Sequence, residues 1–411
     1  MTLNELKKPL AIAMWDSSWL RRRYEGGGFE SFDRALDELL ERGYNAVRID
    51  PFPHMIANAP DGTNAERFLD PPSVTHKVGF AAWGSPWTVY IYPRRDVVEF
   101  LRKCEARGIR VLLSTWLKPT AEKRNELLWG KEDLVRIWDE TLLFLKENDC
   151  LGPVIGVDVQ NEIPYGACNT WLYRQMNALP RSPYEGRPRS QEQIAYYRAY
   201  FSDVIRELKM RWPELPISAS LDHGTFMDGA ENMDFSCYDF LDVHMWAENA
   251  GSDFLKPRKL YQKLKSFGEP ETLYTYFRSG YLNPSSRVAG DIEFERISEA
   301  LHESWYQNRS LCEEWLETRV ATVSEIAKRY GIPCGNTEGW GPIHWIEHPL
   351  VSWDMVKDAG IIGARLGKKY GYAFNCQSNF CEPQFRSLWK DVGYHLSVTD
   401  LIRGKAETKG K

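Results

Sequence analysis

Short apolar runs typical of β-strands alternate with amphipathic helical segments along almost the whole chain. This alternation constrains the fold more than any other feature of the sequence. The first run is Leu10–Trp15, and a helical pattern follows over Ser31–Arg42. Most of the runs are apolar at successive positions, which is typical of parallel strands that are covered on both faces. The pattern therefore predicts a parallel sheet with a helix after nearly every strand.

Eight strand–helix units can be traced. The other predicted strands are Asn45–Asp50, Ile109–Ser114, Val154–Gln160, Ile217–Ser220, Phe240–Met245, Ile332–Thr337 and Tyr372–Cys376. The other predicted helices are Asp96–Gly108, Lys131–Glu147, Gln191–Arg211, Cys312–Tyr330, a segment from Leu350 to Leu366, and the residues from Phe385 onward. An open doubly wound sheet would need a glycine-rich phosphate loop after the first strand. Gly26–Gly28 lacks that spacing, so an α/β fold of the (β/α)8 TIM-barrel type is expected.

The chain is expected to form a single catalytic domain over residues 1–411. Three long segments, at about 51–95, 163–190 and 246–311, have little strand or helix pattern and are interpreted as insertions in the βα loops. All three follow predicted strands, on the side where barrel enzymes build their sites.

Charge and cysteine content exclude several classes of protein. The net charge is -5, and no basic stripe offsets it, so a nucleic-acid partner is not expected. The N-terminal residues lack the long apolar stretch of a signal peptide or a membrane span. The 8 cysteines contain no CxxC pair, which favours a reduced, cytoplasmic location.

Two glutamates follow predicted strands at the points where those strands end. Asn161-Glu162 ends the fourth run, and Glu338 ends the seventh. A single glutamate after a strand is commonly a helix cap or a surface residue. Two of them, each in a turn rich in Gly, Pro or Trp, suggest the pair of carboxyl groups that a glycosidase uses, one as acid/base and one as nucleophile.

The ordered set of motifs resembles glycoside hydrolase clan A, the retaining (β/α)8 glycosidases, and is closest to uncharacterised bacterial cellulase-like proteins. The resemblance implies that Glu162 is the acid/base and that Glu338 is the nucleophile. It also implies that Arg48 supports the nucleophile and that Asn161 binds the sugar 2-hydroxyl. His244 resembles the polar residue that ends strand six in several clan families. Arg48 could equally form a structural ion pair, and His244 could be a core histidine.

Several aromatic and polar residues follow strand ends and are expected at the rim. Aspartates there would grip hydroxyls and tryptophans would stack on sugar, with about half of the set touching substrate and the rest supporting loops. They are Trp15, Asp16, Asp50, His54, Trp116, Trp246 and Trp340. Clan members commonly have a tryptophan after strand eight. This chain has Phe374–Phe380 there, so either Phe380 or a tryptophan from another loop takes its place, or the reactive subsite differs.

A metal site and a cofactor are not expected. His344–His348 matches the H-x-x-E-H protease pattern, which needs a helix to bring both histidines to one face. Pro342 and Pro349 bracket that segment and argue against such a helix.

The sequence thus predicts a retaining glycoside hydrolase that cleaves a β-linked glycoside by double displacement. The long segments favour a pocket and hence exo-action on oligosaccharides. A carbohydrate-binding barrel without turnover and a transglycosylase with the same glutamates are the alternatives. No membrane partner is expected, and the sequence leaves the sugar, the linkage and the oligomeric state open.

Overall fold

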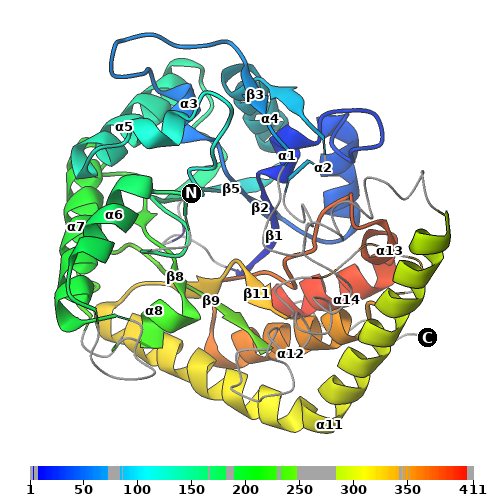
Figure 1. Ribbon diagram of the computed structural model, residues 1–411. Helices are drawn as coiled ribbons and strands as arrows, with labels where there is room; N and C mark the ends of the chain where they lie inside the picture. Colours follow the sequence, from blue (N-terminus) through cyan, green and yellow to red (C-terminus); the bar gives the residue numbers. More distant parts are fainter. Residues whose placement is uncertain are drawn as a thin grey trace.

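The fold is built on a curved parallel sheet surrounded by helices (Figure 1). The computed structural model describes residues 3, 8–72, 84–85, 87–164, 167–181, 189–227, 229, 233–247, 284–341, 345, 347, 349 and 351–404. The strands of the sheet are β1 (Leu10–Asp16), β2 (Ala46–Ile49), β5 (Arg110–Ser114), β6 (Val154–Asp158), β7 (Ile217–Ser218), β8 (Leu221–Asp222), β9 (Leu241–Trp246), β10 (Cys334–Asn336), β11 (Gly339–Trp340) and β12 (Phe374–Asn375). A separate antiparallel pair is formed by β3 (Phe68–Asp70) and β4 (Val89–Ile91).

The strand pairings lead around the sheet in sequence order. β1 pairs in parallel with both β2 and β12, β2 pairs with β5, and β5 pairs with β6. β7 pairs with β6 and β8 pairs with β9, and only Ala219 and Ser220 separate β7 from β8. β10 joins β9 to β12. This arrangement is TIM-barrel-like and confirms the predicted α/β class.

Helices cover the outer face of the sheet (Figure 1). They are α1 (Ser18–Arg21), α2 (Phe32–Glu41), α3 (Pro53–Ile56), α4 (Pro93–Ala106), α5 (Lys131–Glu147), α6 (Thr170–Ala178), α7 (Gln191–Arg211), α8 (His223–Met227), α11 (Pro284–Tyr330), α12 (Asp354–Tyr370), α13 (Arg386–Trp389) and α14 (Val392–Ile402), with a 3-10 turn at Arg124–Leu127. In the described part of the chain, no helix has the length and apolar character that crossing a bilayer would require.

Two helices differ from the sequence prediction. α11 begins at Pro284, whereas the helix was predicted to begin at Cys312. Its apolar pattern is weak, and contacts with α12 help to hold it, since Trp305 and Arg309 both donate hydrogen bonds to Asp358. α6 lies in the segment 163–190 that was predicted as a loop. Residues 73–83, 182–188 and 248–283, in the three predicted insertions, lie outside the described residues.

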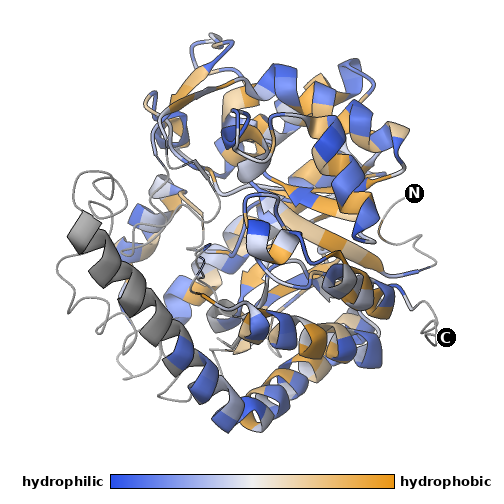
Figure 2. Ribbon diagram, turned by 90° about the vertical axis from the view of Figure 1, so that its right-hand side faces the viewer, coloured by the Kyte–Doolittle hydropathy of each residue, from blue (hydrophilic) through white to orange (hydrophobic). Residues whose placement is uncertain are grey.

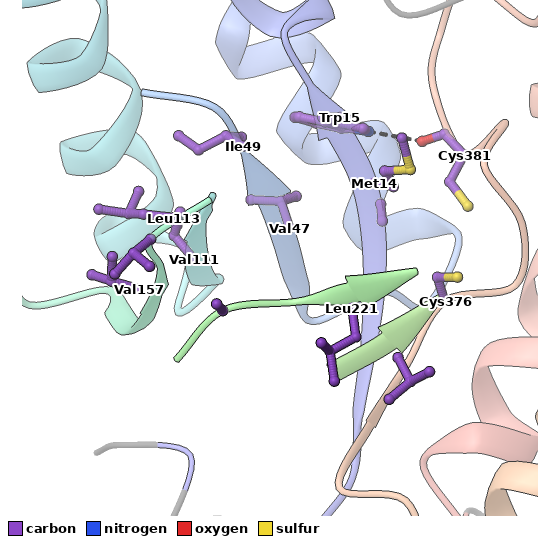
Figure 3. Packing of buried hydrophobic residues seen from close by; sticks show 14 of the residues in the cluster. Met14, Trp15, Val47, Ile49, Val111, Leu113, Val157, Leu221, Cys376 and Cys381 are labelled. Atoms are coloured by element: carbon purple, nitrogen blue, oxygen red, sulfur yellow. Dashed lines mark hydrogen bonds between the residues drawn. The ribbon is translucent and has the colours of Figure 1, made fainter. Parts of the chain in front are cut away.

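Two hydrophobic clusters lie on the two faces of the sheet. The larger one fills the space between strands and helices, and Figure 3 shows part of it, including Val47 and Ile49 from β2 with Val111 and Leu113 from β5. The apolar positions accordingly concentrate in the strands and on parts of the helices (Figure 2). The smaller cluster consists of Leu3, Leu10, Ile12, Ala46, Leu112, Ile155, Phe240 and Phe374.

The face of the sheet that holds the smaller cluster becomes polar toward the carboxyl ends of the strands, as the alternation of side chains shows. On β9, Asp242, His244 and Trp246 follow Phe240 at every second position and share its face of the strand. The same step of two on β2 leads from Ala46 to Arg48. The inner face is therefore apolar near the amino ends of the strands and polar near their carboxyl ends.

Candidate active site

Glu162 and Glu338 lie close together at the carboxyl ends of β6 and β10. One carboxylate oxygen from each and one ring nitrogen of His244 all lie within 4.8 Å of one another. His244 Nδ1 is 3.0 Å from Glu162 Oε1 and 3.6 Å from Glu338 Oε2. Residues that are 176 positions apart in the sequence therefore share one small site.

Arg48 from β2 binds Glu338 and fixes the polar residues around it. Its Nη2 donates to Glu338 Oε2 at 2.5 Å, and Nη2 and Nε donate to the two oxygens of Asp16 at 2.8 Å. Its Nη1 donates to Thr337 Oγ1 at 2.8 Å and to His244 Nε2 at 3.0 Å. These bonds use every N–H of the guanidinium, which is fully buried.

The bonds of Arg48 determine where the proton of His244 lies. An arginine N–H can only donate, so Nε2 of His244 accepts and the proton sits on Nδ1. Burial lowers the pKa of His244, whereas Asp242 and then Glu162 and Glu338 raise it, to about 10 overall. A pKa this high would favour a second proton on the ring. That proton would sit on Nε2 and point at the N–H of Arg48, 3.0 Å away, which excludes it. We therefore assign a neutral ring whose Nδ1–H faces both glutamates.

The two glutamates make each other harder to ionise. Burial raises the pKa of Glu162. Burial and then the neighbouring Glu162 carboxylate raise the pKa of Glu338 to about 7, although Arg48 opposes this rise. Two carboxylates this close accommodate one negative charge far more readily than two.

A chain of hydroxyl and backbone contacts holds Glu162. The residue has φ 50°, a left-handed backbone conformation that is uncommon for a non-glycine residue. Its backbone N–H donates to Ser220 Oγ at 3.0 Å. Ser220 Oγ donates to Asp158 Oδ2 at 2.8 Å, and Ser114 Oγ donates to the same oxygen at 2.7 Å. Asp158 is fully buried and thereby links β5, β6 and the end of β7.

Two of the predicted rim tryptophans do not face the site. Trp15 is fully buried, packs edge-on against Phe29 and donates its indole N–H to the carbonyl of Cys381 (Figure 3). Trp340 is also fully buried, donates to the carbonyl of Cys376, and packs so closely on Gly363 that a Cβ there would clash. The prediction that Trp15 and Trp340 offer stacking faces is therefore wrong, because both rings pack into the larger hydrophobic cluster on the outer side of the sheet.

Trp116 and Trp246 are the predicted tryptophans that remain near the glutamates. Trp116 is half-buried, and its indole N–H donates to Asp16. Trp246 is 4% exposed and contacts His244 edge-on, with ring centroids 6.1 Å apart. Its indole nitrogen has no hydrogen-bond partner among the described residues.

The predicted sugar-gripping aspartates are engaged within the protein. Asp16 is bound by Arg48 and Trp116, as described above. Asp50 accepts the backbone N–H of Phe52 at 2.7 Å and that of Trp116 at 2.9 Å, and burial raises its pKa to about 6. Their carboxyl groups therefore position neighbouring loops and Arg48, and direct binding of substrate by either aspartate stays a prediction.

Three other expectations have mixed outcomes. Asn161 is fully buried beside Glu162, and neither atom of its amide has a partner among the described residues. His54 donates to the carbonyl of Lys118 at 2.9 Å and is buried, so it is not at the rim surface. Phe380 packs with Trp353 and Phe385 in an aromatic cluster and does not replace the strand-eight tryptophan.

Metal binding is disfavoured where it would be sterically possible. Among the described residues, Glu162, His244 and Glu338 form the group whose ligand atoms are close enough to hold an ion. The guanidinium of Arg48 already binds Glu338 there and would repel a cation. The histidines at 344 and 348 of the H-x-x-E-H segment lie outside the described residues, and Glu347 accepts hydrogen bonds from Ser387.

Sequence reasoning found Arg48 but missed other residues that support the glutamates, namely Asp242, Ser220 and Asp158. Asp242 accepts the backbone N–H and the hydroxyl of Thr337, at 3.0 Å and 2.5 Å, and lies 3.6 Å from Nε2 of His244. The signal for Asp242 was present, because it precedes His244 by two positions on one strand. Ser220 and Asp158 carried no such signal.

The family model for cellulase-like proteins, described as sugar-binding cellulase-like, matches residues 12–403. The chain belongs to the cellulase-like family. This result confirms the predicted relationship to cellulase-like proteins. No match was found among curated proteins.

Solved structures agree with this family assignment. A protein from Parabacteroides distasonis, provisionally assigned as a glycoside hydrolase, is 28% identical to this cellulase-like chain, with a TM-score of 0.73. The match covers 96% of this chain and 94% of that one.

More distant structures also match over most of their length. They include an endo-1,4-beta-mannanase from Rhizomucor miehei (10% identity, TM-score 0.44, covering 97% of each chain) and an endocellulase from Pyrococcus horikoshii (11% identity, TM-score 0.45, covering 95% and 93%). At these TM-scores, the likeness contributes nothing to the functional argument.

Proposed function

We propose that this cellulase-like protein is a retaining glycoside hydrolase that cleaves a β-linked glycoside by double displacement. The observation that carries the proposal is the proximity of Glu162 and Glu338, whose nearest oxygens lie within 4.8 Å. Retaining enzymes hold their two carboxyl groups about 5–5.5 Å apart, whereas inverting enzymes need more space for a water molecule.

The surroundings of each glutamate support a division of roles. Glu338 is the nucleophile, because the cationic Arg48 donates to it at 2.5 Å and favours its ionised form. Glu162 is the acid/base, because burial raises its pKa and its nearest donor is the neutral His244. In the first step, Glu162 protonates the leaving oxygen while Glu338 attacks the anomeric carbon. In the second step, Glu162 takes a proton from the water that releases the sugar from Glu338.

Two further residues are assigned to the reacting sugar. Asn161 donates to or accepts from the 2-hydroxyl, which would pair its free amide. Trp246 takes the place of the tryptophan that clan members commonly carry after strand eight, with its unpaired indole N–H available to a hydroxyl. Trp116 lies farther out at the rim.

We also propose the finer features that the sequence suggested. The chain forms a single catalytic domain, and the segments 51–95, 163–190 and 246–311 are insertions that narrow the site to a pocket. Such a pocket suits exo-action on oligosaccharides. A cytoplasmic location is supported by the cysteines, all of which are free.

A panel of aryl β-glycosides tests the proposal. Release of the aryl group by the wild-type protein, and its loss in both Glu162→Ala and Glu338→Ala, is the expected result. The description of the family as sugar-binding favours a second candidate, a barrel that binds sugar without turnover. Sugar binding with no aryl release from any glycoside would support that candidate and overturn hydrolysis. Product analysis with an added acceptor sugar would detect a transglycosylase.

A further inference from the structure

Lys118 is a cationic side chain near the candidate site that has no anionic partner among the described residues. It lies in the loop after β5, and its Nζ is 4.9 Å from the ring centroid of Trp116. The indole N–H of Trp116 donates to Asp16, which binds Arg48. The ammonium group of Lys118 is therefore one aromatic ring away from the network that holds Glu338.

The carboxylates that interact electrostatically with Lys118 already have other partners. Asp16 accepts from Arg48 and Trp116, Asp50 accepts two backbone N–H groups, and Asp70 pairs with Arg21 at 2.7 Å. In the described part of the chain, no ion pair or hydrogen bond joins any of them to Nζ of Lys118. A half-buried ammonium with three N–H donors and only a ring face beside it is poorly satisfied.

The backbone of Lys118 is held in place, so its side chain is presented from a fixed point. His54 donates from Nε2 to the carbonyl oxygen of Lys118 at 2.9 Å. Burial lowers the pKa of His54 to about 3, so this ring stays neutral and adds no charge. Burial and the nearby guanidinium of Arg21 also lower the pKa of Lys118. An added anion would relieve both effects.

We propose that Lys118 binds an anionic substituent of the sugar, either a carboxylate or a sulfate ester, and that the protein acts on acidic glycosides. The inference depends on the proposed function for the identity of the site. It gives a direct anionic partner to an ammonium group that has only the ring of Trp116 in contact among the described residues. The chain as a whole carries a net charge of -5, so unspecific attraction of anions does not provide the same effect.

Binding of free sugars tests the inference without any need for turnover. Glucuronic acid, galacturonic acid and glucose 6-sulfate are compared with glucose and galactose by calorimetric or NMR titration. In the wild-type protein, at least one acidic sugar should bind about tenfold or more tightly than its neutral counterpart. Lys118→Met should abolish that preference, and Lys118→Arg should retain much of it. The carboxylate and sulfate arms identify the group that is bound.

Lys123→Met is the matched control. Lys123 lies in the same loop, its side chain is 67% exposed, and its ion-pair partner among the described residues is the exposed Glu126, at 3.6 Å. It should bind all the sugars as the wild type does. Absence of any preference in the wild type, including absence of binding by every acidic sugar, would overturn the inference. So would a preference that survives Lys118→Met. If acidic sugars bind through Lys118 but no aryl glycoside is cleaved, the hydrolase proposal fails while the role of Lys118 in binding an anionic sugar stands.

Discussion

The two glutamates of the candidate site are held by different kinds of contact, although both follow strands of one sheet and both face His244. Glu338 is bound directly by the guanidinium of Arg48, which is itself fixed by Asp16 and Thr337. Glu338 is nearly inaccessible, with 3% of its side chain exposed. Glu338 therefore lies in a buried site, in direct contact with a positively charged side chain.

In the part of the chain that the structure describes, no arginine or lysine side chain binds Glu162 directly. Ser220 holds its backbone N–H, Asp158 holds Ser220, and the neutral His244 donates to its carboxylate. Its side chain is 14% exposed, more than that of Glu338. The difference teaches that the cation of Arg48 favours the negative charge of the pair on Glu338, whereas Glu162 exchanges a proton with solvent or substrate.

The largest expected effect separates the two roles directly. Glu338→Ala should lower kcat/KM on an aryl glycoside by about 10⁴-fold or more, because no nucleophile remains. Azide should restore turnover and give a glycosyl azide of inverted configuration, measured by NMR. Glu162→Ala with azide should give retained configuration instead. The opposite pair of products would show that the roles are exchanged.

The next prediction tests the contact between Arg48 and Glu338. Arg48→Met removes the cation that donates to Glu338, and kcat/KM should fall about 10²- to 10³-fold. Thermal unfolding checks that the variant is folded. Arg42→Met is the control, because Arg42 is also buried but stacks on Trp389 away from the glutamates. Equal losses of activity in both variants would contradict a specific role for Arg48.

A smaller loss of activity is expected when the hydrogen bond between Ser220 and the backbone of Glu162 is removed. Ser220→Ala frees the backbone N–H of Glu162, and kcat should fall about tenfold with little change in KM, because only the position of the acid/base is disturbed. Ser114→Ala is a matched control, since Ser114 donates to the same oxygen of Asp158 but does not contact Glu162. Both variants should lose about 1 kcal/mol of stability. A rate loss of similar size in Ser114→Ala would mean that Ser220 acts only through stability.

The last prediction concerns how the stability of the folded protein depends on pH. The pKa of Glu338 is raised to about 7 in the folded protein, so the folded state binds more protons than the unfolded state between about pH 4.5 and 7. Stability should therefore fall as pH rises through this window. Glu338→Gln removes that contribution, so its stability relative to the wild type should increase by about 1–3 kcal/mol from pH 4.5 to pH 8. Chemical denaturation at the two pH values measures the difference. A constant difference would argue against a raised pKa.

Local patterns predicted much of the fold. Strand and helix positions such as α5 and α7 were predicted within a residue or two, because their apolar spacing and end signals are local. The beginning of α11 was not, because contacts with α12 rather than a regular apolar stripe hold that part of the helix. The split of the fifth strand into β7 and β8 was also not visible in the sequence.

The sequence by itself determined that Glu162 and Glu338 would meet, because both follow strands and parallel strands bring their carboxyl ends to one rim. The family resemblance added Arg48 and His244, which lie within β2 and β9. Only the tertiary structure decided which neighbours support them. Ser220 reaches Glu162 across 58 positions, and Thr337 reaches Arg48 across 289. Trp15 turned away because it alternates with Leu10 and Ile12 along β1 and shares the outer face with Ala11 and Ala13. For Trp340, packing between distant segments set the direction of the ring, which donates to Cys376 and packs on Gly363.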